Sequence, residues 1–179
     1  MRGATQVVNS YEHDEKGYGA QGEIASARVG QNEKRLRKIE RARDLVPPPK
    51  RYGPETADLS LIVFGTTKQP ALEAMGWLAD EGVHVNMLQV VTIWPFPAED
   101  VSEFLDAATR TLIVEGNATG QLEGLIRQEC LRGADDRLHR YDGRPFSPEQ
   151  IYAHVKRMLG IRVDALPSGA SLEEVGLDA

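Results

Sequence analysis

Four short segments hold the side chains of this sequence that could bind a ligand or a partner. Each follows an apolar run that we expect to be a strand, and all are rich in Gly, Pro, Thr, Asn or Arg: 65–67, 92–97, 116–121 and 142–146. In an open α/β sheet, ligands bind beyond the carboxyl ends of the strands. We therefore predict a ligand site or an interface on this rim. Its candidate residues are Thr66, Thr67, Trp94, Asn117, Thr119, Gly120, Gln121, Asp142 and Arg144.

Segment 116–121 leads from an expected strand into an expected helix. Free backbone N–H groups at a helix start, beside Asn117 or Thr119, form a generic anion site. The alternative is a tight turn in which these side chains cap the helix, and the same two readings apply to Thr66 and Thr67. The segment matches neither a Walker A motif nor the G-x-G-x-x-G motif, so no nucleotide site is predicted from a motif.

The other two segments also leave alternatives open. Arg144 could bind a carboxylate or phosphate through two hydrogen bonds, or it could pair with Asp142 or with an acid of a partner. The WPFP sequence at 94–97 could cover the end of the sheet or contact a neighbouring subunit. The residues alone do not separate these readings.

Catalytic residues are not apparent anywhere in the sequence. The four histidines lack metal-ligand spacing, and no Ser/His/Asp set or carboxylate pair can be identified. The single cysteine, Cys130, rules out an internal disulfide and any four-cysteine cluster within the chain. It lies on the apolar face of an expected helix, which favours a core thiol over a nucleophile. We predict no metal site and no catalytic residue.

Strands and helices alternate in the central part of the chain. The runs 59–64, 83–91, 111–114 and 137–141 are typical of strands, the first three being apolar enough for burial on both faces. Between and after them, apolar residues recur at helical spacing around 72–79, 101–108, 122–130 and 151–159. This order predicts a doubly wound, mostly parallel α/β sheet with three α/β/α layers.

Charge and proline content divide the chain into three parts. Residues 1–55 hold 11 Lys/Arg against 8 Asp/Glu, whereas residues 56–179 hold 10 against 19, and three prolines lie near that change. We predict an irregular arm, a basic helix over 32–46 capped by Asn32 and a Pro-rich linker within 1–49. The α/β domain is expected over 50–160, and a mobile or partner-docked tail over 161–179.

Composition and hydropathy of the whole chain argue against two classes of partner. The net charge of −6 and the pI near 5.3 argue against nucleic acid, and no apolar run approaches the length of a membrane span. The first 30 residues have no apolar core of a signal peptide, so we expect a cytoplasmic protein.

Several motifs, taken in their order along the chain, resemble the C-terminal part of the alpha subunit of 2-oxoacid:ferredoxin oxidoreductases, above all the 2-oxoglutarate type. They are YEHDEKG at 11–17, KRLRK at 34–38, the prolines at 47–49, WPFP at 94–97, VEGNATGQL at 114–122 and YDGRPF at 141–146. The resemblance extends to about residue 160. It implies domain II of that family, which has the transketolase C-terminal fold with a five-stranded mixed sheet of order 1-3-2-4-5. Strand 1, which is antiparallel, would lie near 50–53.

The resemblance also implies a function. Enzymes of this family use thiamine diphosphate, coenzyme A and a [4Fe–4S] cluster to decarboxylate a 2-oxoacid oxidatively, and they pass the electrons to ferredoxin. The expected partners are a beta-type thiamine-binding subunit and the remaining alpha and gamma domains, with self-association as a further alternative. The chain itself is expected to bind no cofactor alone. It would be a non-catalytic subunit or a segment of a larger one.

A second hypothesis comes from the loop rim. An independent α/β module could bind an anionic ligand there, such as coenzyme A or a nucleotide, through Thr66, Asn117, Thr119 and Arg144. Catalysis by the chain alone is the weakest of the three readings.

Overall fold

A computed structural model describes residues 24–173 and residue 175. The chain forms two compact units, Met1–Val46 and Pro47–Ala179. The motif at 11–17 and most of the expected irregular arm lie outside the described residues. No helix in the described part of the chain is long and apolar enough to cross a membrane.

The first unit contributes helix α1, Ala25–Ala42, which begins earlier and ends earlier than predicted. Asn32 is not the N-cap but lies inside the helix, where its Oδ1 accepts a hydrogen bond from Arg35. The residues from Ala25 to Gln31 contain Ala, Arg and Gln, which favour a helix and extend it toward the N-terminus. The apolar side chains Leu36 and Ile39 are 66% and 36% exposed, so they are accessible to a partner in the described structure.

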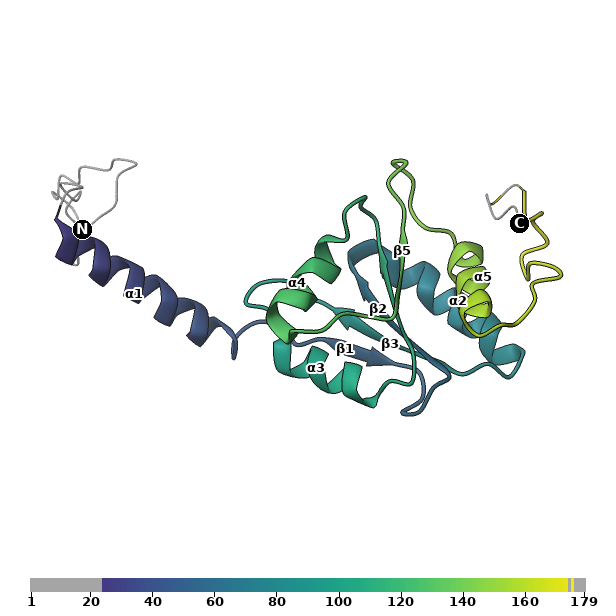
Figure 1. The fold of residues 1–179 in the computed structure, drawn as a ribbon, viewed down its shortest axis with the longest axis horizontal. Coiled ribbons are helices and arrows are strands. Elements are labelled where there is room, and N and C mark those ends of the chain that lie inside the picture. Colours follow the sequence, from purple (N-terminus) through teal and green to yellow (C-terminus); the bar gives the residue numbers. More distant parts are fainter. Residues whose placement is uncertain (1–23, 174, 176–179) are drawn as a thin grey trace, which may run out of the picture. The chain divides into compact units, whose positions relative to one another are not determined.

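The second unit is built on a five-stranded sheet of order β1-β3-β2-β4-β5 (Figure 1). Strand β1 is antiparallel to β3, and all other pairs are parallel. This is the mixed sheet that the family resemblance implied, so the fold prediction is confirmed. The strands are β1 (Lys50–Tyr52), β2 (Leu59–Phe64), β3 (Val85–Val90), β4 (Thr111–Glu115) and β5 (Asp136–His139).

Helices cover both faces of the sheet, with α2 and α5 on one face and α3 and α4 on the other (Figure 1). The helical elements are the 3₁₀ turn η1 (Gly65–Thr67), α2 (Lys68–Asp80), α3 (Ala98–Ala107), α4 (Gln121–Cys130) and α5 (Pro148–Met158). Alternate residues of β2 and β4 point to opposite faces, so each strand contributes to both cores. Burial on both faces explains why these runs are continuously apolar.

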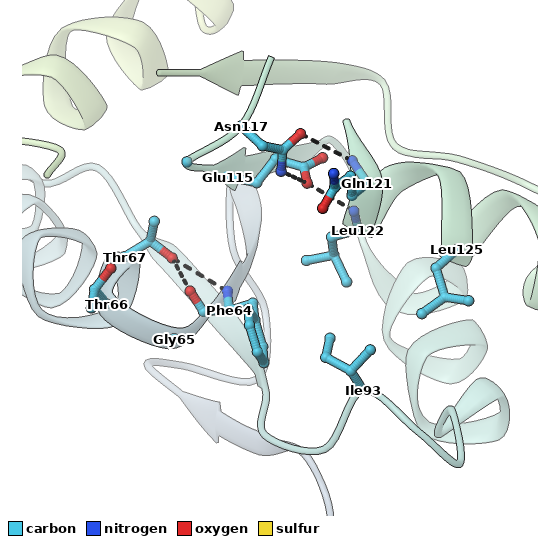
Figure 2. A pocket seen from close by; sticks show the side chains of 11 residues that line it. Phe64, Gly65, Thr66, Thr67, Ile93, Glu115, Asn117, Gln121, Leu122 and Leu125 are labelled. Atoms are coloured by element: carbon cyan, nitrogen blue, oxygen red, sulfur yellow. Dashed lines mark hydrogen bonds between the residues drawn. The ribbon is translucent and has the colours of Figure 1, made fainter. Parts of the chain in front are cut away.

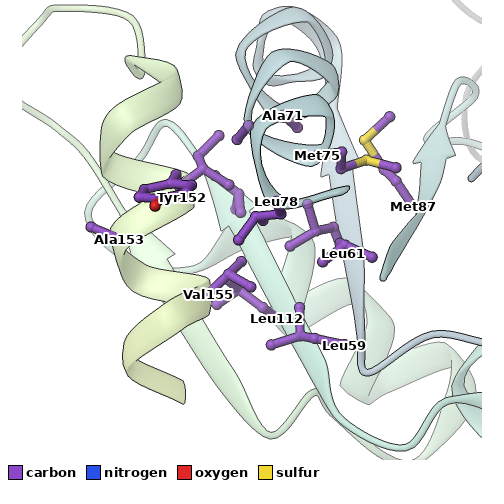
Figure 3. Packing of buried hydrophobic residues seen from close by; sticks show 14 of the residues in the cluster. Leu59, Leu61, Ala71, Met75, Leu78, Met87, Leu112, Tyr152, Ala153 and Val155 are labelled. Atoms are coloured by element: carbon purple, nitrogen blue, oxygen red, sulfur yellow. The ribbon is translucent and has the colours of Figure 1, made fainter. Parts of the chain in front are cut away.

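The core on the α2 and α5 side joins the two helices to the central strands (Figure 3). Leu59, Leu61 and Leu112 from the sheet, Leu78 from α2 and Val155 from α5 are fully buried. A buried leucine or valine side chain contributes about 1.5–3 kcal/mol, so this face fixes the positions of both helices.

The segment after Gly160 differs from the mobile or partner-docked tail that we expected. Leu166 is only 5% exposed and belongs to the core formed with α2 and α5. Val163, Ala170 and Leu172 pack against the same cluster. Isolated apolar residues among Pro, Gly and Ser lack helical or strand spacing, which is why the pattern did not indicate this packing.

Strands β2 and β4 are neighbours, yet the helices that follow them lie on opposite faces. Helix α2 follows β2 on one face, and helix α4 follows β4 on the other. In open α/β sheets such a reversal of winding leaves a crevice beyond the carboxyl ends of the two strands.

Candidate functional site

A pocket of about 500 Å³ lies at this crevice, beyond the carboxyl ends of β2 and β4 (Figure 2). Ligand pockets commonly measure 300–1,000 Å³, so its size suits a small molecule. One side is polar and the other carries apolar side chains. The lining residues are Phe64, Gly65, Thr66, Thr67, Ile93, Glu115, Gly116, Asn117, Gln121, Leu122 and Leu125.

Glu115, the last residue of β4, lies on the polar side of the pocket and is 4% exposed. Its Oε2 accepts hydrogen bonds from Asn117 Nδ2 at 2.6 Å and from the backbone N–H of Leu122 at 2.8 Å. Its Oε1 accepts one from the backbone N–H of Glu123 at 3.2 Å. A carboxylate is favoured at a helix N-terminus because the free N–H groups there carry partial positive charge.

Asn117 satisfies the remaining N–H groups at the start of α4. Its Oδ1 accepts hydrogen bonds from Thr119 at 3.1 Å, Gly120 at 2.7 Å and Gln121 at 3.2 Å. Of the two alternatives for 116–121, the structure therefore shows the tight turn in which side chains cap the helix. An anion could reach these N–H groups only by displacing Glu115 and Asn117.

Gly120 is required by the shape of this loop. Its φ is +70°, and a Cβ atom there would lie 3.2–3.4 Å from the His139 ring and from Glu123. The His139 Nε2 lies 3.6 Å from Glu115 Oε1. The loop thus packs closely between β4, β5 and α4.

Glu123 forms a second buried acidic position behind the pocket and is 3% exposed. It accepts hydrogen bonds from Arg127 at 2.6 Å and from Arg137 at 2.9 Å. Burial raises the pKa of this carboxyl group, but the two guanidinium groups outweigh that effect and hold the pKa below its ordinary value.

The two threonines after β2 differ in environment. Thr67 is buried, and its hydroxyl donates to the Phe64 carbonyl at 2.7 Å and accepts from the Phe64 N–H at 3.3 Å. It therefore has the capping role. Thr66 is exposed and lines the pocket, so it is the threonine that can contact a ligand.

The other predicted residues also lie beyond the carboxyl ends of the strands, but they do not line the pocket. Asp142 pairs with Arg140 at 2.8 and 2.9 Å, and the Arg144 N–H also donates to it, so its pKa lies well below its usual range. The side chain of Arg144 is exposed in the loop after β5, and Trp94 is 56% exposed after β3. The pocket thus joins Thr66, Thr67, Asn117 and Gln121, but not Trp94, Thr119, Gly120, Asp142 or Arg144.

Sequence reasoning missed Glu115 and the apolar side of the pocket. Glu115 directly follows an apolar run and precedes a helix start, so an acidic residue at the end of a buried strand was the available signal. Phe64, Ile93, Leu122 and Leu125 looked like ordinary core residues, because periodicity does not distinguish a pocket wall from a core.

The described residues contain no group of three or more His, Cys, Asp or Glu side chains that could hold a metal ion. The thiol of Cys130 lies 3.6 Å from the Ala98 carbonyl oxygen between α4 and α3. The described lining combines apolar side chains, uncharged polar groups and one carboxylate held by N–H groups, an arrangement suited to binding a small molecule.

Comparison with known proteins places this domain in a family. Residues 57–151 match the model for the pyruvate:ferredoxin oxidoreductase core domain II. The alpha subunit of 2-oxoacid:ferredoxin oxidoreductase 2 from Aeropyrum pernix is 35% identical over 159 residues, which are 87% of this chain and 24% of that subunit. The chain therefore spans about a quarter of that relative's length.

Two solved structures share the fold. The 2-oxoglutarate:ferredoxin oxidoreductase from Magnetococcus marinus, solved with 2-oxoglutarate, coenzyme A and succinyl-CoA bound, aligns with a TM-score of 0.75 at 28% identity. The alignment covers 86% of this chain and 27% of that one. A split-gene transketolase aligns with a TM-score of 0.50 at 16% identity, over 64% of this chain and 42% of its own, which shows the fold alone. The family match over more than half of the sequence means that this chain belongs to the pyruvate:ferredoxin oxidoreductase core domain II family.

Proposed function

We propose that the chain supplies domain II of a 2-oxoacid:ferredoxin oxidoreductase, in which partner domains decarboxylate the 2-oxoacid and form acyl-CoA. The observation that carries this proposal is the alignment of 86% of the chain with a 2-oxoglutarate:ferredoxin oxidoreductase. The same relative makes 2-oxoglutarate the first substrate to test. The chain's own role would be to support the assembly rather than to react with the substrate.

The cysteine content and the described pocket of this chain do not fit the cofactors of such an enzyme. A [4Fe–4S] cluster needs about four thiolates, and the sequence has only Cys130. A diphosphate needs cations or free N–H groups. In the described part of the chain, Glu115 is the only charged side chain that lines the pocket, and the N–H groups beside it already have acceptors. Thiamine diphosphate, the cluster and coenzyme A would therefore be held by a beta-type subunit and the other alpha and gamma domains, which would pass electrons to ferredoxin.

Helix α1 supports a docking role. Leu36 and Ile39 are exposed on it, beside the basic sequence at 34–38. Exposed apolar side chains on an otherwise charged helix gain stability when a partner covers them. The helix would thereby join this domain to the thiamine-binding part of the enzyme.

Reconstitution tests this proposal. The beta-type subunit and the remaining alpha-subunit domains of the source organism are mixed with or without this chain, and ferredoxin reduction is followed with 2-oxoglutarate, pyruvate and 2-oxoisovalerate. We expect coenzyme A-dependent activity only when the chain is present, and the highest kcat/KM for 2-oxoglutarate. Equal activity without the chain would refute the proposal, and preference for another 2-oxoacid would refute only the substrate assignment.

A further inference from the structure

The geometry points to a further property of this chain, a binding site for a small uncharged ring-shaped molecule in the pocket between β2 and β4. The inference concerns this pocket alone and does not depend on the proposed function. Three observations carry it: the types of the described lining residues, the polar groups among them that lack a hydrogen-bond partner, and the absence of cationic side chains from that lining.

One side of the pocket is apolar. Figure 2 shows Phe64, Ile93, Leu122 and Leu125 facing the same space. They come from the end of β2, the loop after β3 and helix α4, so three separate elements converge on it. Phe64 is 43% exposed, a large fraction for a phenylalanine beside a pocket. A planar ring could cover this surface and stack on the Phe64 ring.

The polar side offers uncharged hydrogen-bonding groups. The Thr66 hydroxyl and the Gln121 side-chain amide both line the pocket, and neither has a hydrogen-bond partner within residues 24–173. Together they can donate and accept hydrogen bonds. Asn117 and Thr67 also line the pocket, but their oxygens are occupied by the bonds described above.

Charge on the lining selects against ionic ligands. Among residues 24–173 and 175, no Lys, Arg or His lines the pocket, and Glu115 is the one charged side chain there. An anion would therefore meet a carboxylate and lose its hydration without gaining a cation. A cation would gain little, because the Glu115 carboxylate already accepts three hydrogen bonds at the positive end of α4. An uncharged ring with a hydrogen-bonding edge is the class of ligand that remains.

A matched pair of probes tests this assignment on the full chain. Nicotinamide is an uncharged aromatic ring with a donor and an acceptor, and nicotinate has the same ring and size but carries a negative charge at neutral pH. Each is titrated into the isotope-labelled chain, and backbone amide shifts are followed by NMR. We expect saturable shifts at 65–67 and 116–122 with nicotinamide, and a dissociation constant for nicotinate at least about tenfold higher.

Two variants and a control locate the binding. Leu125→Trp fills the pocket and should abolish the nicotinamide shifts, whereas Leu131→Trp, at a 90% exposed leucine outside the pocket, should leave them unchanged. Thr66→Val keeps the side-chain shape but removes the hydroxyl, and should raise the dissociation constant about threefold to tenfold.

Three results would overturn the inference: no saturable nicotinamide shift, nicotinate binding as tight as nicotinamide, or unchanged binding in the Leu125→Trp chain. If Leu125→Trp does not fold, Thr66→Val decides the matter, and an unchanged dissociation constant in that variant counts against the site.

Discussion

The carboxylate of Glu115 accepts a hydrogen bond from the backbone N–H of Leu122 at 2.8 Å, so the last residue of β4 caps the helix that follows it. The same carboxylate places a negative charge on the lining of the pocket. A helix start that would otherwise attract an anion is filled from within the chain by Glu115 and Asn117. The same contact links the central sheet to α4, so it is both a structural feature and a determinant of what the pocket can bind.

Removing this carboxylate should destabilise the domain. In Glu115→Ala, the N–H groups of Leu122 and Glu123 lose their acceptor while they stay buried, which should lower the free energy of unfolding by about 2 kcal/mol. Urea denaturation measures this loss. Glu73→Ala, at an exposed acid of α2, is the control and should change the free energy by less than about 0.5 kcal/mol. An equal loss in the two variants would contradict the capping role.

Two glycines of the same region should respond to alanine in opposite directions. Gly120→Ala places a Cβ against the His139 ring at a φ of +70° and should cost about 1–2 kcal/mol. Gly124→Ala lies inside α4, with no atom within 4 Å of the added Cβ, and should stabilise the chain by about 0.5–1 kcal/mol. Thermal or urea unfolding of both variants tests the pair, and a stabilising Gly120→Ala would contradict the requirement for glycine at this position.

His154 should make the folded chain less stable as the pH is lowered. It is 7% exposed, and burial lowers its pKa although Asp136 opposes that effect. The unfolded chain, in which histidine titrates near 6.5, therefore binds more protons than the folded chain below that pH. The free energy of unfolding should fall as the pH is lowered from about 7 to about 5.

His154→Gln should make that decrease less steep, as measured by urea denaturation across the same pH range. His84→Gln changes an exposed histidine and serves as the control, with a slope expected to match the original chain. An unchanged slope in His154→Gln would contradict the assignment of this pH dependence to His154.

The exposed face of α1 should matter for assembly and not for folding. The double change Leu36→Asp and Ile39→Asp should alter the free energy of unfolding by less than about 0.5 kcal/mol, because both side chains are already accessible. Association with the other oxidoreductase domains should weaken, as measured by light scattering. Leu131→Asp with Ile161→Asp, at two exposed apolar residues of the second unit, is the matched control and should still associate.

Much of the fold could be predicted from local patterns. Strands β2, β3 and β4 followed from apolar runs such as Leu59–Phe64, because burial on both faces requires them. Strand β1 followed only from the family resemblance, since its Lys50 and Arg51 are exposed and its three residues show no pattern. The boundaries of α1 were wrong because a plausible capping residue, Asn32, lies within a longer stretch of helix-forming residues.

The sequence indicated where the pocket lies, but only some of the residues that line it. The rule that ligands bind beyond the carboxyl ends of strands located the rim, and Thr66, Asn117 and Gln121 do line the pocket. Which loops come together depends on strand order, and the loop after β5 belongs to an edge strand. Arg144 in that loop therefore does not reach the pocket. The filling of the α4 N-terminus by Glu115 is a tertiary contact that spacing does not specify.

If this chain is a part of a 2-oxoacid:ferredoxin oxidoreductase, it should assemble with the other subunits, and the molar mass of the mixture measures that assembly. The chain is mixed with the beta-type subunit and the remaining alpha-subunit domains of its source organism, and the mixture is analysed by size exclusion with light scattering. We predict a single complex that contains this chain in a fixed ratio to the beta-type subunit. A chain that elutes alone, while the other subunits form an active oxidoreductase without it, would show that it is not a part of that enzyme.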